Sequence, residues 1–275
     1  MFSLPPFSLE TTGKSAHELA SVADLFAAHT PVNIAFLGNE SHAQRIQAAA
    51  TIKSLGLEPT PIISSRRLQS KEDFYHYVDP LVKQSHIKRL MVVGGDPKQP
   101  QGPYNDSIGL LKSDLLKSCE LETVVIAGYP EGHPHIRSQQ LIESLKWKVA
   151  FLKQQNVKVE ITTQLAFCTE SIVKWIETIR SSGIHEPIRI GVPSSTRVKT
   201  LSYFAQQFGV EISAASLEKY AMDTTDETLE AKTDALYQEL TQTIKRHGYE
   251  NIYFHLYTLD GMVKSKAWLE NFLRP

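Results

Sequence analysis

The stretch TVVIAGYPEGHPHIRSQQLIESLKWKVAFLKQQNVKVEITTQ, residues 123–164, decides the fold. It opens with an apolar, β-branched run, passes through a polar loop into a helical pattern over Ile136–Gln154, and ends in a second β-branched run, Lys158–Gln164. A strand that is apolar on both faces is typical of a parallel sheet, and parallel neighbours need a crossover, usually a helix. The stretch therefore predicts one β-α-β unit.

The same order recurs along the whole chain, and no Pro-, Gly- or Ser-rich linker divides it. The predicted strands are Phe7–Glu10, Val32–Leu37, Thr60–Ser64, Arg89–Gly94, Thr123–Gly128, Lys158–Gln164, Ile188–Val192 and Ile252–Tyr257. Helical patterns cover Ser15–Ala28, Ser41–Ser54, Lys71–Lys83, Ser107–Ser118, Ile136–Gln154, Glu170–Ser182 and Arg197–Phe208. Such repetition predicts an α/β fold, a (βα)8 TIM barrel that forms one domain over residues 1–275.

An open, doubly wound sheet is the main alternative to the barrel. The sequence contains neither a G-x-G-x-x-G loop after its first strand nor a G-x-x-x-x-G-K-[ST] loop, so the barrel is favoured. The segment Val210–His247 is longer than one crossover, and we expect it to hold an extra turn or short strand and a helix over Asp226–His247. Leu217, Tyr220 and Met222 are either core residues or candidates for a loop that closes over substrate.

Composition excludes several classes of protein. The 275 residues carry 29 Lys+Arg against 30 Asp+Glu, without the basic excess of a nucleic-acid-binding domain, and 41% hydrophobic residues exclude a disordered chain. Two cysteines cannot form a disulfide framework, and the N-terminus lacks the pattern of a signal peptide. No apolar run approaches the ~18 residues of a membrane span. We therefore expect a cytoplasmic protein without nucleic-acid or membrane partners, and a homo-oligomer is left open.

The barrel prediction limits where the active site can lie, because barrel enzymes place it at the carboxyl ends of the strands. Those ends are rich in polar side chains. They carry Glu10, Asn39, Glu40, Ser64, Ser65, Asp96, Tyr129, Glu131, His133, Gln164, Ser194, Ser195, Tyr257 and Asp260.

Two of these strand ends favour chemistry, each with a plainer alternative. Glu10 ends the apolar run Phe7–Leu9 and is a candidate general acid, or else a strand-end partner of a salt bridge. The loop Gly94-Gly95-Asp96-Pro97 allows the backbone to approach a flat ligand closely and places Asp96 beside it, although the same residues also form an ordinary turn.

Three other features are weaker candidates. His133 and His135 with Glu131 resemble half of a zinc site, but no matching ligands occur at the other strand ends, so we expect no metal. Cys168 has no identifiable activating base, and a plain thiol is favoured over a nucleophile. Ser194-Ser195 precedes a helix and is either an anion site or, more simply, an N-cap.

Six ordered segments resemble the methylenetetrahydrofolate reductase family, a (βα)8 barrel family. They are FSLE (7–10), GGDP (94–97), GYPEGHP (128–134), LKWKV (145–149), TQLAF (163–167) and HLYTL (255–259). They resemble, in turn, the family's strand ending in a catalytic Glu, its R-G-D-P loop, and its A/G-Y-P-x-x-H-P, L-K-x-K-V, T-Q-x-x-F and H-x-Y-T-L segments. Gly102-Pro103-Tyr104 follows the second segment as in the family.

The resemblance implies an oxidoreductase of one-carbon metabolism and methionine biosynthesis. It would interconvert 5,10-methylenetetrahydrofolate and 5-methyltetrahydrofolate, with electrons from NAD(P)H relayed by FAD. Glu10 would protonate the folate nitrogen so that the ring opens to an iminium. Catalytic roles are implied for Glu10, Asp96 and Gln164, cofactor contacts for Gly94, Gly95, Asp96, Tyr129, His133 and Lys148, and substrate contacts for Glu10, Asp96, Gln164, Phe167 and Tyr257.

The chain departs from the family at several flavin contacts. Gly94 stands where the family has its flavin-phosphate Arg, and Pro61-Ile62-Ile63-Ser64 replaces Pro-His-Leu-Thr. The end of the second strand is Phe36-Leu37-Gly38-Asn39 instead of Thr-Tyr/Trp-Gly. On the helix after Tyr129, Leu141, Ser144 and Trp147 occupy polar contact positions and only Lys148 is retained; Arg66, Arg67 and Lys98 are candidate replacements.

These departures leave four interpretations open. The first is a reductase with an FAD relay, and the second is a reductase that passes hydride directly from NAD(P)H to the iminium. The third is a barrel methyltransferase that uses methyltetrahydrofolate with a corrinoid partner protein, and the fourth is a folate-binding protein without activity.

Overall fold

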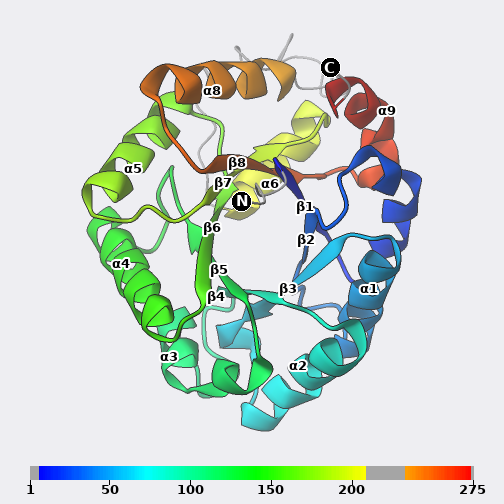
Figure 1. The fold of residues 1–275 in the computed structure, drawn as a ribbon, viewed down its shortest axis with the longest axis vertical. Coiled ribbons are helices and arrows are strands. Elements are labelled where there is room, and N and C mark those ends of the chain that lie inside the picture. The colour runs from blue at the N-terminus through cyan, green and yellow to red at the C-terminus, as the bar shows by residue number, and fades with distance from the viewer. Residues whose placement is uncertain (1–5, 209–232, 274–275) are drawn as a thin grey trace.

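Eight parallel strands pair in sequence order, and the last pairs with the first, so that the sheet closes into a barrel (Figure 1). This computed structural model describes residues 6–208 and 233–273. The strands are β1 (Phe7–Thr11), β2 (Pro31–Ile34), β3 (Glu58–Ser64), β4 (Arg89–Val93), β5 (Thr123–Gly128), β6 (Lys158–Leu165), β7 (Ile188–Pro193) and β8 (Ile252–Tyr257). This closed strand order confirms the predicted TIM barrel. The prediction was possible because apolar strands buried on both faces require helical crossovers.

Helices surround the barrel. In Figure 1, α1 to α5, α8 and α9 lie around the strands, with α8 between α5 and α9. The α-helices are α1 (His42–Ser54), α2 (Lys71–Ser85), α3 (Ser107–Lys112), α4 (Ser138–Gln154), α5 (Thr169–Ser181), α6 (Val198–Phe208), α8 (Thr233–His247) and α9 (Met262–Leu273). Short 3-10 helices are η1 (Ala16–Ser21), η2 (Ala23–Leu25), η3 (Ser65–Arg67) and η4 (Leu115–Cys119).

Some predicted helices differ from the structure. Residues 15–28 form η1 and η2 instead of one helix. The pattern Ser107–Ser118 is split into α3 and η4, where Asp114 adopts a left-handed conformation (φ 61°) that a continuous helix cannot contain. Helix α9 was not expected from the sequence. Within the predicted helix Asp226–His247, residues 233–247 form α8, whereas Leu217, Tyr220 and Met222 lie outside the described residues.

A buried ion cluster crosses the barrel interior near the amino ends of its strands. Glu160 of β6 binds Arg89 of β4 and accepts a hydrogen bond of 2.9 Å from Nε of Arg189 of β7. All three residues are buried. Burial by itself raises the pKa of Glu160, but the two guanidinium groups outweigh it and hold the pKa below its ordinary value of 4.5. The cluster therefore joins three strands through one ionised carboxylate.

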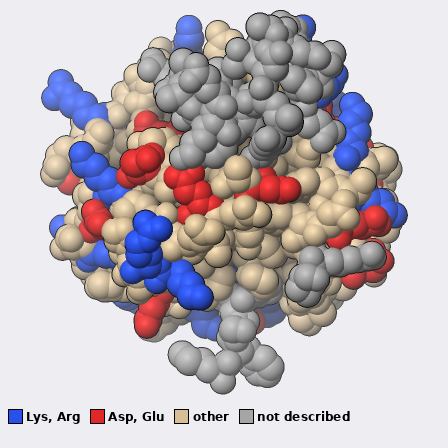
Figure 2. Space-filling view, turned by 90° about the horizontal axis from the view of Figure 1, so that it is seen from above, with Lys and Arg blue, Asp and Glu red and all other residues tan. Residues whose placement is uncertain are grey.

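Charged side chains of both signs lie on one face of the molecule (Figure 2). On the face shown in Figure 2, acidic and basic side chains are interspersed and do not form a basic stripe. Among the helices described, none has the length and apolar character needed to cross a bilayer.

We predict that Glu160→Gln lowers the free energy of unfolding by about 3–5 kcal/mol, because it leaves two buried arginines without their anion. Urea unfolding measures this loss. The carboxylate's pKa is lowered by folding, so its contribution is complete above pH 4.5 and is lost as pH falls through the folded pKa. Glu122→Gln is the control, because Glu122 pairs with Lys88 at the surface at 3.8 Å and its loss costs at most about 1 kcal/mol. Equal losses in the two variants would contradict the assignment.

Candidate active site

The carboxyl end of β1 places Glu10 against a buried histidine of β8. Oε2 of Glu10 lies 3.6 Å from Nε2 of His255, whose side chain is fully buried. Nδ1 of the same ring is 2.8 Å from Oγ of Ser8, the residue with which His255 pairs across the two strands. Ser8 and Glu10 are two residues apart on β1 and so share one face. The acid predicted from sequence is therefore half-buried and held beside a histidine.

His255 is a residue that sequence reasoning missed as part of the site. Its signal was nevertheless present, because His255 and Tyr257 alternate with apolar residues along β8 and so face the same side as each other. A fully buried histidine two residues before a strand end in a predicted barrel is a candidate for contact with the active site.

A β-bulge in β6 shapes the opposite wall. The register between β6 and β7 shifts between Thr162 and Leu165, and the shifted residues include Gln164. Tyr257 donates a hydrogen bond of 3.2 Å to the carbonyl of Thr163. Gly191 makes this arrangement possible: a Cβ there would lie 2.6 Å from the ring of Tyr257 and 2.8 Å from the carbonyl oxygen of Thr163. The bulge and the tyrosine therefore form one packed unit beside Gln164.

The electrostatics connect Tyr257 to two other predicted site residues. Burial raises the pKa of Tyr257 well above its ordinary value, and the charges of Glu10 and Tyr129 raise it further. Burial also raises the pKa of Tyr129, whose ring contacts that of His133 edge to face at 5.4 Å. Burial lowers the pKa of His133. Glu10, Tyr129 and Tyr257 thus interact across the barrel, and both tyrosines remain neutral donors at physiological pH.

Asp96 does not join this group in the structure. Its side chain is 73% exposed and receives two hydrogen bonds, of 2.9 and 2.7 Å, from Nε and Nη2 of Arg67. The bonds from Arg67 hold the pKa of Asp96 below its ordinary value. Arg67 reaches it across Gly38, where a Cβ would lie 2.3 Å from a guanidinium nitrogen. Asp96 therefore faces an arginine at the rim.

The glycines of the predicted close-approach loop have different surroundings. Gly95 has φ of +99°, and a Cβ there would lie 1.9 Å from Oγ of Ser64, so this position requires glycine. A Cβ at Gly94 would have no neighbour within 4 Å, so an arginine side chain there would not clash at its base. Of the two glycines, only Gly95 therefore has no room for a side chain.

Lys148, a predicted cofactor contact on α4, is buried between helices. Its Nζ lies 3.4 Å from Oγ of Ser107, and burial lowers its pKa to about 8, opposed by Asp106. Trp147 beside it stacks on Phe151 with ring centres 4.8 Å apart. The side chains of Lys148 and Trp147 therefore pack within the helical layer.

Several acidic residues of the predicted polar ring hold loops together. Oε1 of Glu131 accepts hydrogen bonds of 2.6 Å from the backbone N–H groups of Phe167 and Cys168, at the start of α5. Asp260 likewise accepts from the backbone of Arg197 and from the hydroxyl of Thr196, before α6. Phe167, a predicted substrate contact, is itself buried. Glu131 therefore positions the loop after β6.

Two further acidic residues act in the same way. Glu40 accepts hydrogen bonds from the N–H groups of Gly13 and Lys14, and Glu18 from those of Met262 and Val263. The hydroxyl groups of Ser194 and Ser265 share a hydrogen bond.

Within residues 6–208 and 233–273, no group of three His, Cys, Asp or Glu side chains has the arrangement of a metal site.

Comparison with known proteins identifies the family. The model of the family described as methylenetetrahydrofolate reductase matches residues 10–271. A 5,10-methylenetetrahydrofolate reductase of Pectobacterium carotovorum subsp. carotovorum is 26% identical over 265 residues, which cover 94% of this chain and 83% of that protein. Methylenetetrahydrofolate reductase (NADH) 1 of Arabidopsis thaliana is 27% identical over 65% of this chain, and the match spans only 32% of the plant protein.

Solved structures agree on the fold. A protein from Clostridium thermocellum, described as binding two copies of 5-methyl-5,6,7,8-tetrahydrofolic acid, matches with a TM-score of 0.68 and 13% identity. The match covers 98% of this chain and 96% of that one. Dihydropteroate synthase from Thermus thermophilus matches with a TM-score of 0.53 and 10% identity over 98% of this chain and 93% of that one. At these identities the likeness concerns the barrel alone.

We predict that Glu131→Ala lowers the free energy of unfolding by about 1–3 kcal/mol, because it leaves the N–H groups of Phe167 and Cys168 without their acceptor. Glu131→Gln retains the one oxygen that accepts both hydrogen bonds and should restore most of this loss. Thermal unfolding of both variants is the measurement. Equal destabilisation by Gln and Ala would show that the negative charge, and not the acceptor oxygen, is required.

Proposed function

Because the chain belongs to the methylenetetrahydrofolate reductase family, we propose that it interconverts 5,10-methylenetetrahydrofolate and 5-methyltetrahydrofolate with NAD(P)H. The observation that supports this most is the half-buried Glu10 at the carboxyl end of β1, held against His255. A half-buried carboxyl group at the mouth of a barrel is placed to protonate a substrate amine.

In the proposed reaction Glu10 donates a proton to the folate nitrogen that leaves the methylene carbon, and the five-membered ring opens to an iminium cation. Hydride from the dihydronicotinamide then adds to that carbon and gives the methyl group. One proton and one hydride are consumed, and NAD(P)+ is released. His255 positions Glu10 through its Nε2, and Ser8 holds the histidine ring from the other side. Gln164, raised on the bulge of β6, supplies an amide for the pterin or the nicotinamide.

The residues of this chain fit poorly to FAD, the cofactor that the resemblance implies. A bound dinucleotide needs cations for its pyrophosphate. Position 94 offers only glycine, and Lys148, retained on α4, is buried against Ser107. Arg66 donates from its Nε, Nη1 and Nη2 to the carbonyl oxygens of Pro97, Asn105 and Lys98, so it holds a loop. Of the two candidate arginines, Arg67 alone has an exposed partner, Asp96, that an anion could replace, so one guanidinium would have to hold both phosphates of the pyrophosphate.

We therefore favour direct hydride transfer from NAD(P)H over an FAD relay. The two substrates would then occupy the barrel mouth together, with Tyr129 and Tyr257 as neutral walls. A second candidate function is a methyltransferase that uses methyltetrahydrofolate. The supporting observation is the same loss of flavin contacts, and the rival needs no nicotinamide.

We expect Glu10→Gln to lower turnover by about 10²–10⁴-fold, because the amide cannot supply the proton. The affinity for 5-methyltetrahydrofolate, measured by calorimetry, should change little. Glu143→Gln on the exposed face of α4 is the matched control, since Glu143 accepts a hydrogen bond from the side chain of Gln139 one turn away and lies outside the site. A variant that retains full turnover would exclude Glu10 as the acid, and a wild-type protein that binds folate without turnover would favour a binding protein.

The absorbance of the purified protein separates the two routes. We expect no flavin bands between about 300 and 550 nm, and consumption of NADH or NADPH only when methylenetetrahydrofolate is present. A flavin spectrum that is bleached by the nicotinamide would support the relay instead. Absence of turnover even with added FAD would favour the methyltransferase.

A further inference from the structure

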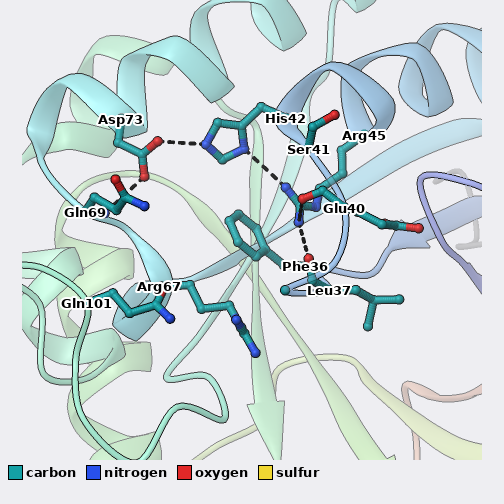
Figure 3. A pocket seen from close by; sticks show the side chains of 11 residues that line it. Phe36, Leu37, Glu40, Ser41, His42, Arg45, Arg67, Gln69, Asp73 and Gln101 are labelled. Carbon is teal, nitrogen blue, oxygen red and sulfur yellow. Dashed lines mark hydrogen bonds and ion pairs between the residues drawn. The ribbon is translucent and has the colours of Figure 1, made fainter.

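A cavity of about 290 Å³ lies beside the barrel mouth, between the amino ends of α1 and α2 (Figure 3). Its lining comes from the segments after β2, β3 and β4 and from the first turns of the two helices. Phe36, Arg45, Arg67, Gln69 and Gln101 are the lining residues that matter here. Arg67 also binds Asp96 of the loop after β4, so its guanidinium lies between the cavity and that carboxylate.

The inner wall is rigid and its proton positions are fixed. Arginine can only donate, so Nδ1 of His42 accepts from Nη1 of Arg45 at 3.2 Å, and its Nε2 donates to Asp73 at 2.9 Å. The ring of His42 is stacked on Tyr77 with centres 4.7 Å apart, and the guanidinium of Arg45 lies 3.9 Å above the ring of Phe36. This wall therefore keeps one geometry without a ligand.

Arg45 brings a buried positive charge to the wall. It is 1% exposed, and its hydrogen bonds go to carbonyl oxygens of Leu37 and Glu40 and to neutral His42. Its Nε–H finds no acceptor, and no carboxylate forms an ion pair with it, among the residues the structure describes. The charges of Glu40 and Asp73 act on Arg45 without contacting it, and a buried cation that lacks a direct ion pair favours an anionic ligand.

The nearby carboxylates are engaged elsewhere. Glu40 binds the N–H groups of Gly13 and Lys14, and Figure 3 shows its carboxylate directed away from Phe36 and Arg67. Asp73 accepts from His42 and from the backbone N–H of Gln69. The ligand would therefore meet mainly donors in this cavity.

We propose that this cavity binds a phosphate group of the nicotinamide nucleotide, with its ribose against Phe36. The inference rests on the proposed function, since it names the place where the hydride donor is anchored. The guanidinium of Arg67 matches a phosphate bidentately, and the side-chain amides of Gln69 and Gln101 line the same space. The volume suffices for a phosphate and a sugar but not for a whole dinucleotide.

Phosphate binding would exchange the partner of Arg67. Its present partner Asp96 is 73% exposed, and an ion pair with so exposed a carboxylate is weak. When Arg67 turns to phosphate, Asp96 is released beside the barrel mouth, where the resemblance places the catalytic aspartate. Binding of the nucleotide thus prepares the site for folate.

The test is the dissociation constant of NADH and of NADPH, measured on the full chain by nucleotide fluorescence. Arg67→Gln should raise it about 10- to 100-fold. Asp96→Asn should lower it, because the competing carboxylate charge is lost. Lys83→Gln removes a positive charge from the exposed face of α2, where Lys83 pairs with Asp79, and should leave the constant unchanged. Opposite effects at positions 67 and 96 cannot arise from misfolding.

Several results would overturn the proposal. One is a nucleotide affinity that Arg67→Gln does not change. Another is that Arg67→Gln weakens the binding of 5-methyltetrahydrofolate alone. A third is that inorganic phosphate binds as tightly as NADPH, which would indicate a free anion site. Competition by ADP and by nicotinamide mononucleotide identifies the anchored phosphate, and competition by neither also contradicts the proposal. Nucleotide binding that depends on Arg67 in a protein without reductase turnover would refute the proposed function and leave the site intact.

Discussion

The pairing of β1 with β8 closes the barrel. The same pairing places Glu10 beside His255. Pairing of Ser8 with His255 sets the register of the two strands. A slip by one residue would turn Glu10 from the interior to the outer face. Because Nδ1 of His255 contacts Ser8 and Nε2 approaches Glu10, closure of the barrel and placement of the acid are one structural event.

Most other acidic groups at the mouth keep the loops in place. Glu131 holds the loop after β6, Asp260 the loop after β7, and Glu40 the loop after β1, each by accepting backbone N–H groups of a neighbouring segment. These hydrogen bonds cross between adjacent β-α units, so the rim is organised before any substrate binds. The chemistry is left to few side chains, chiefly Glu10, with Gln164 and Tyr257 around it.

The sequence predicted the strands well because parallel barrel strands are apolar on both faces; Thr123–Gly128 and Ile252–Tyr257 agree to the residue. It could not separate rim residues that hold loops from those that face substrate, because Glu131 and Glu10 follow strands alike. It could not foresee that Arg67 takes Asp96, since this pair joins two loops across Gly38. Nor could a motif reveal that Lys148 is buried, which depends on how α3 packs on α4.

The central claim is that hydride passes from the nicotinamide to the folate within one ternary complex anchored beside Glu10. Its most direct test is turnover with NADPH or NADH carrying deuterium on the transferred position of C4, in ordinary water. We expect that the methyl group of 5-methyltetrahydrofolate retains the whole label and that initial-rate plots intersect. Label lost to water, with parallel initial-rate plots, would show a carrier between the two substrates and would contradict the claim.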